Sequence, residues 1–103
     1  MSHDDTTIEL RWVRWRVTGR VQRVGFRWFV QQAAIRQYLV GDVCNLADGS
    51  VEIRVRGTKQ ELERLLAEVR RGPDGARVDD VEMLHPESAE SVATFAIRHP
   101  DKR

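Results

Sequence analysis

The feature that most constrains the fold is the stretch from residue 19 to residue 27, Gly-Arg-Val-Gln-Arg-Val-Gly-Phe-Arg. Just before it, apolar residues alternate with arginines over residues 13–17, which is the pattern of a strand with one buried face. Just after it, apolar residues recur at helical spacing over residues 26–38. A turn from strand to helix leaves backbone N–H groups unpaired at the positive end of a helix dipole, where anions bind.

Arg27 lies in the first turn of the predicted helix and makes this stretch a candidate anion site. Its planar guanidinium can hold a phosphate or a carboxylate through two parallel hydrogen bonds. A turn that contains glycine and arginine can equally be a simple connection whose charges face solvent. Both interpretations are open on this stretch alone, so the rest of the chain has to distinguish them.

Length and charge limit the class of protein. A chain of 103 residues can bury one hydrophobic core, which we expect over residues 9–99, between a disordered polar tail at 1–8 and a C-terminal tail at 100–103. The 17 basic and 16 acidic residues give a net charge of +1, which provides no strong field for an extended polyanion. Any anion site must therefore be local.

Cysteine content and hydropathy indicate the compartment. Cys44 is the only cysteine, so it cannot form an internal disulfide, and this suits a reducing environment. The chain has no apolar run of membrane-spanning length, and its start lacks the pattern of a secretion signal. We expect a cytoplasmic protein with no membrane partner.

The first half of the chain predicts a strand at about 10–18, a helix at about 24–38 and then two strands joined by a hairpin. Gly41 follows the helix, and we expect it to take the left-handed conformation common at helix C-termini. Asp48-Gly49 stands between the two strand-like runs and predicts a tight turn in which both residues have positive φ.

The second half of the chain begins with a strand at 51–56, where apolar residues alternate with charged ones and predict one buried face. Thr58 and Glu61 form a capping box at the start of a helix that ends before Gly72-Pro73. The remaining elements are a strand around residues 81–83, a polar turn at 87–91 and a last strand around 93–97.

This order predicts an α+β fold, the ferredoxin-like βαββαβ sandwich, with an antiparallel sheet, two helices on one face and a short final strand. The sequence does not specify where the final strand lies in the sheet. In most such domains the first two strands are parallel and the third lies between them, so their C-terminal ends share one edge. Asn45 should therefore lie near the loop that follows the first strand, on the same face as Val43. Its side-chain carbonyl could orient a water toward a bound anion, or it could be only a polar residue satisfied near a turn.

Three blocks of the sequence resemble the acylphosphatase family. They are residues 19–27, then Val43, Asn45 and Asp48-Gly49, and finally Arg71-Gly72-Pro73 through Val78, and the resemblance extends from about residue 10 to residue 98. The resemblance implies the ferredoxin-like fold predicted above. It also implies hydrolysis of the carboxyl-phosphate bond of small acylphosphates, by water attack at phosphorus, to a carboxylate and inorganic phosphate. No metal and no cofactor are implied.

The resemblance also implies roles for individual residues. Arg27 matches the arginine that binds the phosphoryl group, and Asn45 matches the asparagine that orients the attacking water. The phosphate-binding loop would consist of Gln22, Arg23, Val24, Gly25 and Phe26. We expect phosphate or sulfate as a bound anion and a monomeric protein. The natural acyl group is left undefined, because the motif specifies only the phosphoryl end.

Two positions depart from the pattern of the family. Members usually carry glycine where this chain has Arg23, and tryptophan or another bulky residue is common where it has Asp42. If position 23 needs positive φ, a side chain there costs on the order of 1 kcal/mol. Arg23 could crowd the site, point outward or add a second cation. An alternative function is therefore a catalytically impaired member that acts as an anion-binding or protein-binding module.

A second alternative is an RNA-binding ferredoxin-like domain. Four arginines could form a basic patch on the open face of the sheet: Arg14, Arg16, Arg54 and Arg56. Such binders stack bases on aromatic side chains of the central strands, and the outward residues of the third predicted strand include none. A nucleic-acid partner is therefore disfavoured.

The histidines and the cysteine do not predict a metal site. His3, His85 and His99 are widely dispersed in the sequence, and Cys44 has the parity opposite to Asn45. None has the spacing of metal ligands. We expect these side chains to be surface or packing residues.

Overall fold

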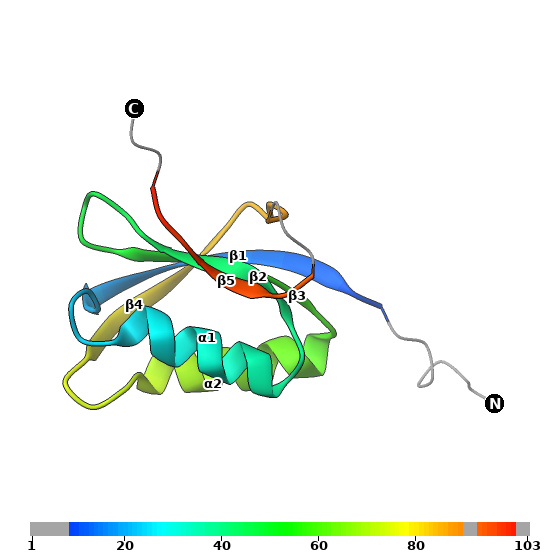
Figure 1. The fold of residues 1–103 in the computed structure, drawn as a ribbon, viewed down its shortest axis with the longest axis horizontal. Helices are drawn as coiled ribbons and strands as arrows, with labels where there is room; N and C mark the ends of the chain where they lie inside the picture. Colours follow the sequence, from blue (N-terminus) through cyan, green and yellow to red (C-terminus); the bar gives the residue numbers. More distant parts are fainter. Residues whose placement is uncertain (1–8, 90–92, 101–103) are drawn as a thin grey trace.

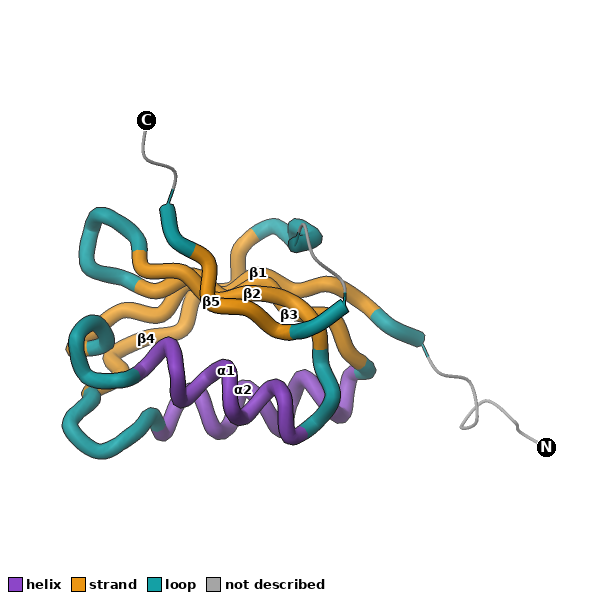
Figure 2. Tube along the Cα trace, viewed as in Figure 1, coloured by secondary structure: helices purple, strands orange, loops and turns teal. Residues whose placement is uncertain are grey.

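Two helices lie against one face of a five-stranded sheet (Figures 1 and 2). The computed structural model describes residues 9–89 and 93–100, so the predicted tail at 1–8 and residues 101–103 lie outside the described residues. The elements are β1 (Arg11–Arg20), α1 (Phe26–Arg36), β2 (Val40–Asn45), β3 (Val51–Gly57), α2 (Lys59–Arg71), β4 (Arg77–Leu84) and β5 (Phe95–Arg98). Neither helix in this part of the chain is long and apolar enough to cross a bilayer.

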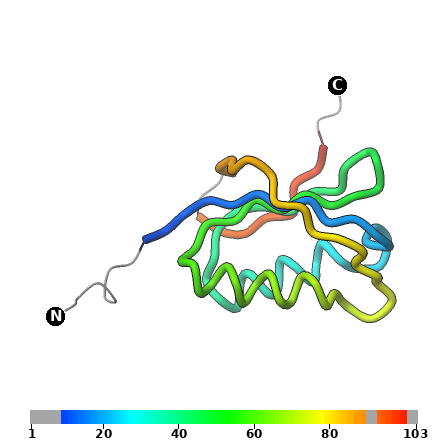
Figure 3. The backbone as a smooth tube through the Cα atoms, turned by 180° about the vertical axis from the view of Figure 1, so that it is seen from behind, coloured from blue at the N-terminus to red at the C-terminus, as the bar shows by residue number. Residues whose placement is uncertain are grey.

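The strand order is β4-β1-β3-β2-β5, which confirms the ferredoxin-like arrangement for the first four strands. These four pair antiparallel, as predicted, but β5 pairs parallel with β2, so the sheet is mixed. β4 and β5, which follow each other in the chain, lie at opposite edges of the sheet. The described residues of their connection lie on the side away from the helices (Figures 1 and 3). The predicted turn at 87–91 extends into residues 90 and 91, which lie outside the described part.

The register of β1, β3 and β2 places the ends of β1 and β2 together. Val17 of β1 and Asn45 of β2 both pair with Val51 of β3, from its two sides. The C-terminal ends of β1 and β2 therefore lie side by side at the same end of the strands, as the sequence predicted. The loop that leaves β1 begins at this end of the sheet.

The hydrophobic core fills the space between the sheet and the two helices. Alternate residues of the central strands are fully buried, among them Val17, Ile53 and Val55. Val30 of α1 and Leu65 of α2 are fully buried against them. This packing fixes the position of α1 on the sheet and with it the loop that precedes α1.

Helix α1 is shorter than the predicted helix at 24–38. It starts after Gly25, whose φ of 78° is left-handed, and its last residue is Arg36, which the C-cap residue Gln37 follows. Tyr38 takes the left-handed position at the end of the helix, with φ of 60°. The N–H of Leu39 then donates to the carbonyl of Ala34 at 3.0 Å, which satisfies one of the free carbonyl groups of the last turn.

The role predicted for Gly41 is wrong. Gly41 lies inside β2, where its φ is 148°, and not at the end of α1. A Cβ atom at this position would lie 2.0 Å from the carbonyl oxygen of Arg54 in β3. Glycine is therefore needed here because two strands approach closely, and not because a helix ends nearby.

The β2–β3 hairpin is longer than the predicted two-residue turn. The N–H of Leu46 donates to Ser50 O at 2.9 Å, and the N–H of Gly49 donates to Leu46 O at 3.2 Å. Gly49 has φ of 95°, whereas Asp48 does not have positive φ, so the expectation of two such residues is wrong. This pattern is the three-residue loop in which only the last residue is left-handed. The Asp48 side chain accepts a hydrogen bond from the N–H of Ser50 at 2.9 Å.

The predicted boundaries of α2, the capping box at Thr58 and the end before Gly72, are confirmed. The N–H of Glu61 donates to Thr58 Oγ1 at 3.2 Å, and the N–H of Thr58 donates to Glu61 Oε1 at 2.9 Å, which completes the capping box. The helix ends at Gly72, whose φ is 67°.

Ion pairs cover the face of the sheet opposite the helices, so β3 is buried on both faces and not on one as predicted. Arg54 donates to the two carboxylate oxygens of Asp42 at 2.9 and 2.6 Å, and Arg14 donates to Glu52 at 2.9 Å. Glu52 and Arg54 are only 9% and 8% exposed. Charges at this depth are tolerated because they are paired.

The other two arginines of this face are also engaged. Arg16 donates to Asp48 at 2.6 Å and to Glu82 at 3.0 Å. The Arg56 guanidinium carbon lies 5.8 Å from the centre of the Trp12 ring, within the range of a cation–π contact. The four arginines therefore do not form a free basic patch, and this removes the feature that favoured the RNA-binding alternative.

Candidate functional site

A cleft of about 390 Å³ lies beside the loop between β1 and α1. Loop and helix residues line one side, and residues of β5 or directly after it line the other: Val21, Arg23, Gly25, Phe26, Arg27, Trp28, Ile97 and His99. Its volume falls within the range of roughly 300–1,000 Å³ typical of small-molecule sites. No carboxylate is among these lining residues.

The first turn of α1 presents unpaired backbone N–H groups. The first bond of the helix runs from the N–H of Phe29 to the carbonyl of Gly25 at 3.0 Å, and no side chain caps this end. The N–H groups of residues 23–28 donate no hydrogen bond to the part of the chain that the structure describes. The first turn also contains no acidic residue to offset the helix dipole. Such an end attracts an anion.

The loop conformation depends on two left-handed residues. Arg23 has φ of 65° and Gly25 has φ of 78°, with Val24 between them outside the left-handed region. Alternation of this kind turns successive N–H groups toward one concave side, where anions bind. Nothing lies within 4 Å of the position that a Cβ would take on Gly25. Glycine is therefore favoured there by φ alone.

The side chain of Gln22 holds this loop against the β2–β3 hairpin. Its Nε2 donates to the carbonyls of Leu46 and Ser50, both at 2.9 Å. Gln22 and Val24 are not among the residues that line the cleft, whereas the other three members of the predicted loop are. The Gln22 amide therefore positions the loop, and Leu46 is the residue next to Asn45.

Asn45 ends β2 and has an unusual side chain. Its Oδ1 atom is buried and accepts no hydrogen bond within the described residues. A buried polar atom without a partner costs about 1–3 kcal/mol. Natural proteins keep such groups mainly where a water, an ion or a ligand uses them. Asn45 is not itself among the lining residues of the cleft. Gln22 of the loop donates to the carbonyl of Leu46, the residue after Asn45, and this bond holds the end of β2 next to the loop.

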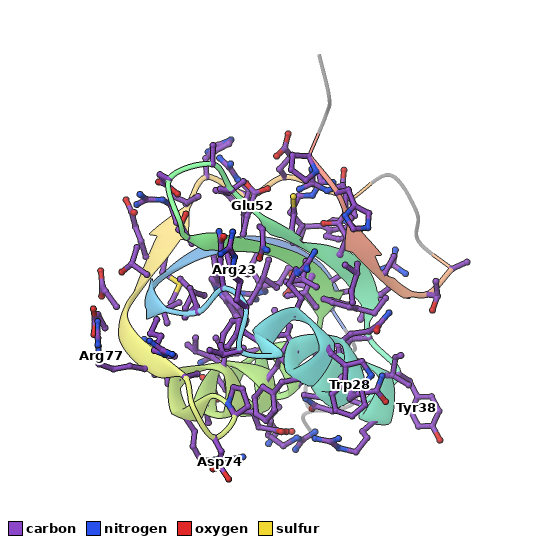
Figure 4. All side chains as sticks on the ribbon, turned by 60° about the vertical axis from the view of Figure 1, so that its left-hand side comes forward. Arg23, Trp28, Tyr38, Glu52, Asp74 and Arg77 are labelled. Atoms are coloured by element: carbon purple, nitrogen blue, oxygen red, sulfur yellow. The ribbon has the colours of Figure 1, made fainter. Side chains whose placement is uncertain are left out.

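Two arginines contribute to the cleft without a partner. Arg27 is half-buried on the first turn of α1, and Arg23 is exposed in the loop (Figure 4). Neither forms a hydrogen bond or an ion pair with the described part of the chain. Most arginines of the open face are paired, so these two differ from them. The cleft combines two free guanidinium groups with free N–H groups, and none of its described lining residues is acidic.

His99 lines the cleft, whereas the sequence predicted only a surface or packing residue at this position. It shares a parity with Ile97, and both line the cleft because β5 lies next to β2. The shared parity is visible in the sequence, but the position of β5 is not. The prediction of no metal site stays a prediction; the described residues contain no group of three or more potential ligands.

Cys44 and Asp42 lie away from the cleft. The Cys44 thiol is fully buried and donates to Asn45 O at 3.2 Å, and burial raises its pKa. Asp42 is paired with Arg54 on the open face of the sheet. The unusual residue at position 42 therefore does not alter the cleft.

Comparisons with known proteins agree on one family. The profile of the Acylphosphatase family matches residues 13–97. An acylphosphatase from Koribacter versatilis is 46% identical over 84 residues, which cover 82% of this chain and 76% of the relative.

Solved structures give the same result. The crystal structure of acylphosphatase from Bacillus subtilis is 38% identical, with a TM-score of 0.78 and coverage of 87% of this chain and 99% of that one. An acylphosphatase structure from Coxiella burnetii is 30% identical, also with a TM-score of 0.78, over 86% of this chain and 93% of that one. The family match over residues 13–97 includes the loop before α1, the end of β2 and every lining residue of the cleft except His99.

Proposed function

The chain belongs to the acylphosphatase family and is a hydrolase of acylphosphates, and on this premise we propose that the cleft beside α1 is its active site. The observation that supports the proposal is the convergence of unpaired N–H groups and a free Arg27 on a cleft whose described lining residues include no carboxylate. An anion is the ligand that satisfies all of these donors at once. The phosphoryl group of the substrate is such an anion.

In this proposal, the N–H groups of residues 23–28 and the Arg27 guanidinium bind the phosphoryl oxygens. They are in place before the substrate arrives, because the left-handed conformations at Arg23 and Gly25 and the two hydrogen bonds of Gln22 hold the loop. Preorganised donors stabilise the charge that redistributes in the transition state at little cost in reorganisation.

Asn45 would orient the attacking water. Its unpaired Oδ1 accepts a hydrogen bond from the water and directs the water oxygen toward phosphorus. The new P–O bond forms as the bond between phosphorus and the acyl oxygen breaks. The electron pair of the broken bond leaves on the carboxylate, and a phosphoryl oxygen of the substrate takes the proton of the water.

This reaction needs no general acid. The leaving carboxylate is a weak base, with a conjugate-acid pKa of about 4 to 5, so it departs without protonation. The absence of Asp and Glu from the lining of the cleft is compatible with this chemistry.

The decisive test is hydrolysis of benzoyl phosphate by the wild type, Arg27→Ala and Asn45→Ala. We expect turnover by the wild type and a loss of at least about 100-fold in kcat/KM in each variant, because each removes a group that acts on the reacting atoms. Arg70→Ala is the matched control, since Arg70 is exposed on α2 outside the cleft. Near-wild-type turnover by either site variant would refute the role of that residue.

Phosphate and sulfate should compete with the substrate for the same donors. Inorganic phosphate should inhibit the wild type competitively and should bind more weakly to Arg27→Ala. Phosphate binding with no hydrolysis of benzoyl phosphate would instead support the alternative of an impaired, anion-binding member. We further propose that the protein acts as a cytoplasmic monomer, which sedimentation and cell fractionation can test.

A further inference from the structure

Arg23 combines a strained backbone with an unused charge. Its φ of 65° lies in the left-handed region, which residues with a side chain seldom occupy. Its side chain is exposed, lines the cleft and forms no ion pair with the described chain. Strained positions of this kind are common at functional sites, and here the strain brings a guanidinium to the cleft.

Arg23 is not needed to complete the phosphoryl site of the proposed function. The N–H groups of the first helical turn and the half-buried Arg27 already supply donors for a phosphoryl dianion. Arg23 lies over the loop that precedes α1, whereas Trp28, 63% exposed, lies on the outer side of that helix (Figure 4). Both line the same cleft, so its surface extends beyond the turn that would hold the phosphate.

The acyl part of a bound substrate must occupy the rest of this cleft. Trp28 and Ile97 provide apolar surface there, and Arg23 provides the free positive charge. We propose that Arg23 is a specificity-determining residue that selects acylphosphates whose acyl group carries a second anionic group, such as a carboxylate. This inference rests on the proposed function of the cleft.

A pair of aromatic substrates isolates this effect. Benzoyl phosphate and 4-carboxybenzoyl phosphate share a ring and a reacting bond and differ in one remote carboxylate, which cannot reach the carbonyl group of its own molecule. The 3-carboxy isomer tests a second direction of approach. The measured quantity is the ratio of kcat/KM for a carboxylated substrate to kcat/KM for benzoyl phosphate.

We expect the wild type to prefer a carboxylated substrate, and Arg23→Gln to lower the ratio by about fivefold, the upper end of the contribution of one ion pair at an exposed site. Any effect of the substitution on the phosphoryl site is common to all three substrates and cancels in this ratio. Arg23→Lys should retain part of the preference, and added salt should reduce it in the wild type. Arg70→Gln removes the same charge outside the cleft and should leave the ratio unchanged.

Two outcomes would overturn the inference. An unchanged ratio in Arg23→Gln would mean that Arg23 does not contact the acyl group. An equal loss for all substrates would place Arg23 on the phosphoryl group instead.

Binding measurements separate this inference from the proposed function. If the wild type does not hydrolyse benzoyl phosphate, the proposed function fails. Calorimetry with benzylphosphonate and 4-carboxybenzylphosphonate then still tests the inference, because neither ligand requires turnover. Arg23→Gln should weaken binding of the carboxylated ligand more than binding of benzylphosphonate, and equal weakening or no change would contradict the inference.

Discussion

At the scale of single residues, the cleft depends on two neighbouring positions that meet the same demand differently. Gly25 takes a left-handed φ of 78° without strain, whereas Arg23 takes φ of 65° with a full side chain. A glycine at position 23 would satisfy the backbone at lower cost but would remove the charge. The two residues therefore share a backbone conformation, and they differ in the positive charge that only Arg23 carries.

Gly25→Ala should destabilise the protein by about 1 kcal/mol because alanine is strained at this φ, although no atom would contact its Cβ. It should also weaken phosphate binding, since relief of the strain would turn N–H groups away from the cleft. Gly75→Ala is the matched control, with φ of 89° and equally open space in the loop before β4. Chemical denaturation and phosphate titration measure the two effects. Equal phosphate affinity in both variants would argue against the loop as the anion site.

At the scale of elements, the β2–β3 hairpin is stabilised by one carboxylate. The Ser50 hydroxyl donates to Asp48, and this bond, followed by the hydrogen bond from Arg16, lowers the pKa of Asp48 far below its usual 3.8. Asp48 therefore stays ionised in the folded protein at a pH where the unfolded chain has already bound a proton. Its contribution to stability is complete above about pH 4, the value for an unperturbed Asp, and is lost as pH falls through the folded pKa.

Asp48→Asn should consequently remove part of the acid sensitivity of the protein. Between pH 5 and pH 2, the denaturant midpoint of the wild type should fall more steeply than that of the variant. Urea denaturation at a series of pH values measures this difference. Parallel curves would contradict the assignment of Asp48, and Asp79→Asn, which removes an exposed carboxylate whose pKa Arg77 lowers, provides a comparison on β4.

The sequence predicted elements well where the signal is local. The capping box of α2 needs only two residues three positions apart, and the structure contains both of its hydrogen bonds. The role of Gly41 was not predictable in this way. Position 41 needs glycine because the carbonyl of Arg54 on the neighbouring strand leaves no room for a Cβ atom, and Tyr38, not Gly41, takes the left-handed conformation at the end of α1. The approach of one strand to another cannot be inferred from neighbours in the sequence.

The candidate site was predictable to a similar extent. The loop and Arg27 follow from a contiguous motif, and Asn45 follows from the strand order. The contribution of His99 depends on the parallel pairing of β5 with β2, a contact between segments about 50 residues apart in the chain. The tether made by Gln22 depends on side-chain contacts with the hairpin, which periodicity does not reveal.

At the scale of the whole molecule, the two faces of the sheet are held by different forces. Apolar side chains pack between the sheet and the helices, and ion pairs cover the other face. The connection between β4 and β5 is held on that face by hydrogen bonds from Arg14 to His85 O and from Arg54 to Ser88 O. Charge pairing thus substitutes for a second apolar layer.

Arg54→Met should destabilise the protein by about 3–5 kcal/mol, because Asp42 would remain buried with its main partner removed. The double variant Asp42→Leu with Arg54→Met should recover most of this loss, since it leaves neither of the two charges unpaired. Urea denaturation of the wild type, both single variants and the double variant gives the coupling energy. If the losses of unfolding free energy in the two single variants add up to the loss in the double variant, the two side chains do not act as a pair.

The contacts of Gln22 have a consequence for engineering the chain. A single amide group spans two carbonyls of the hairpin, so lengthening that hairpin would displace the anchor of the loop between β1 and α1. The exposed bend between α2 and β4 lies at the same end of the molecule (Figure 1), and its Gly75 carbonyl accepts a hydrogen bond from Arg20 Nε at 3.2 Å, so this bend is tied to the end of β1. The β2–β3 hairpin is thus a connection whose length cannot change without moving the loop before α1.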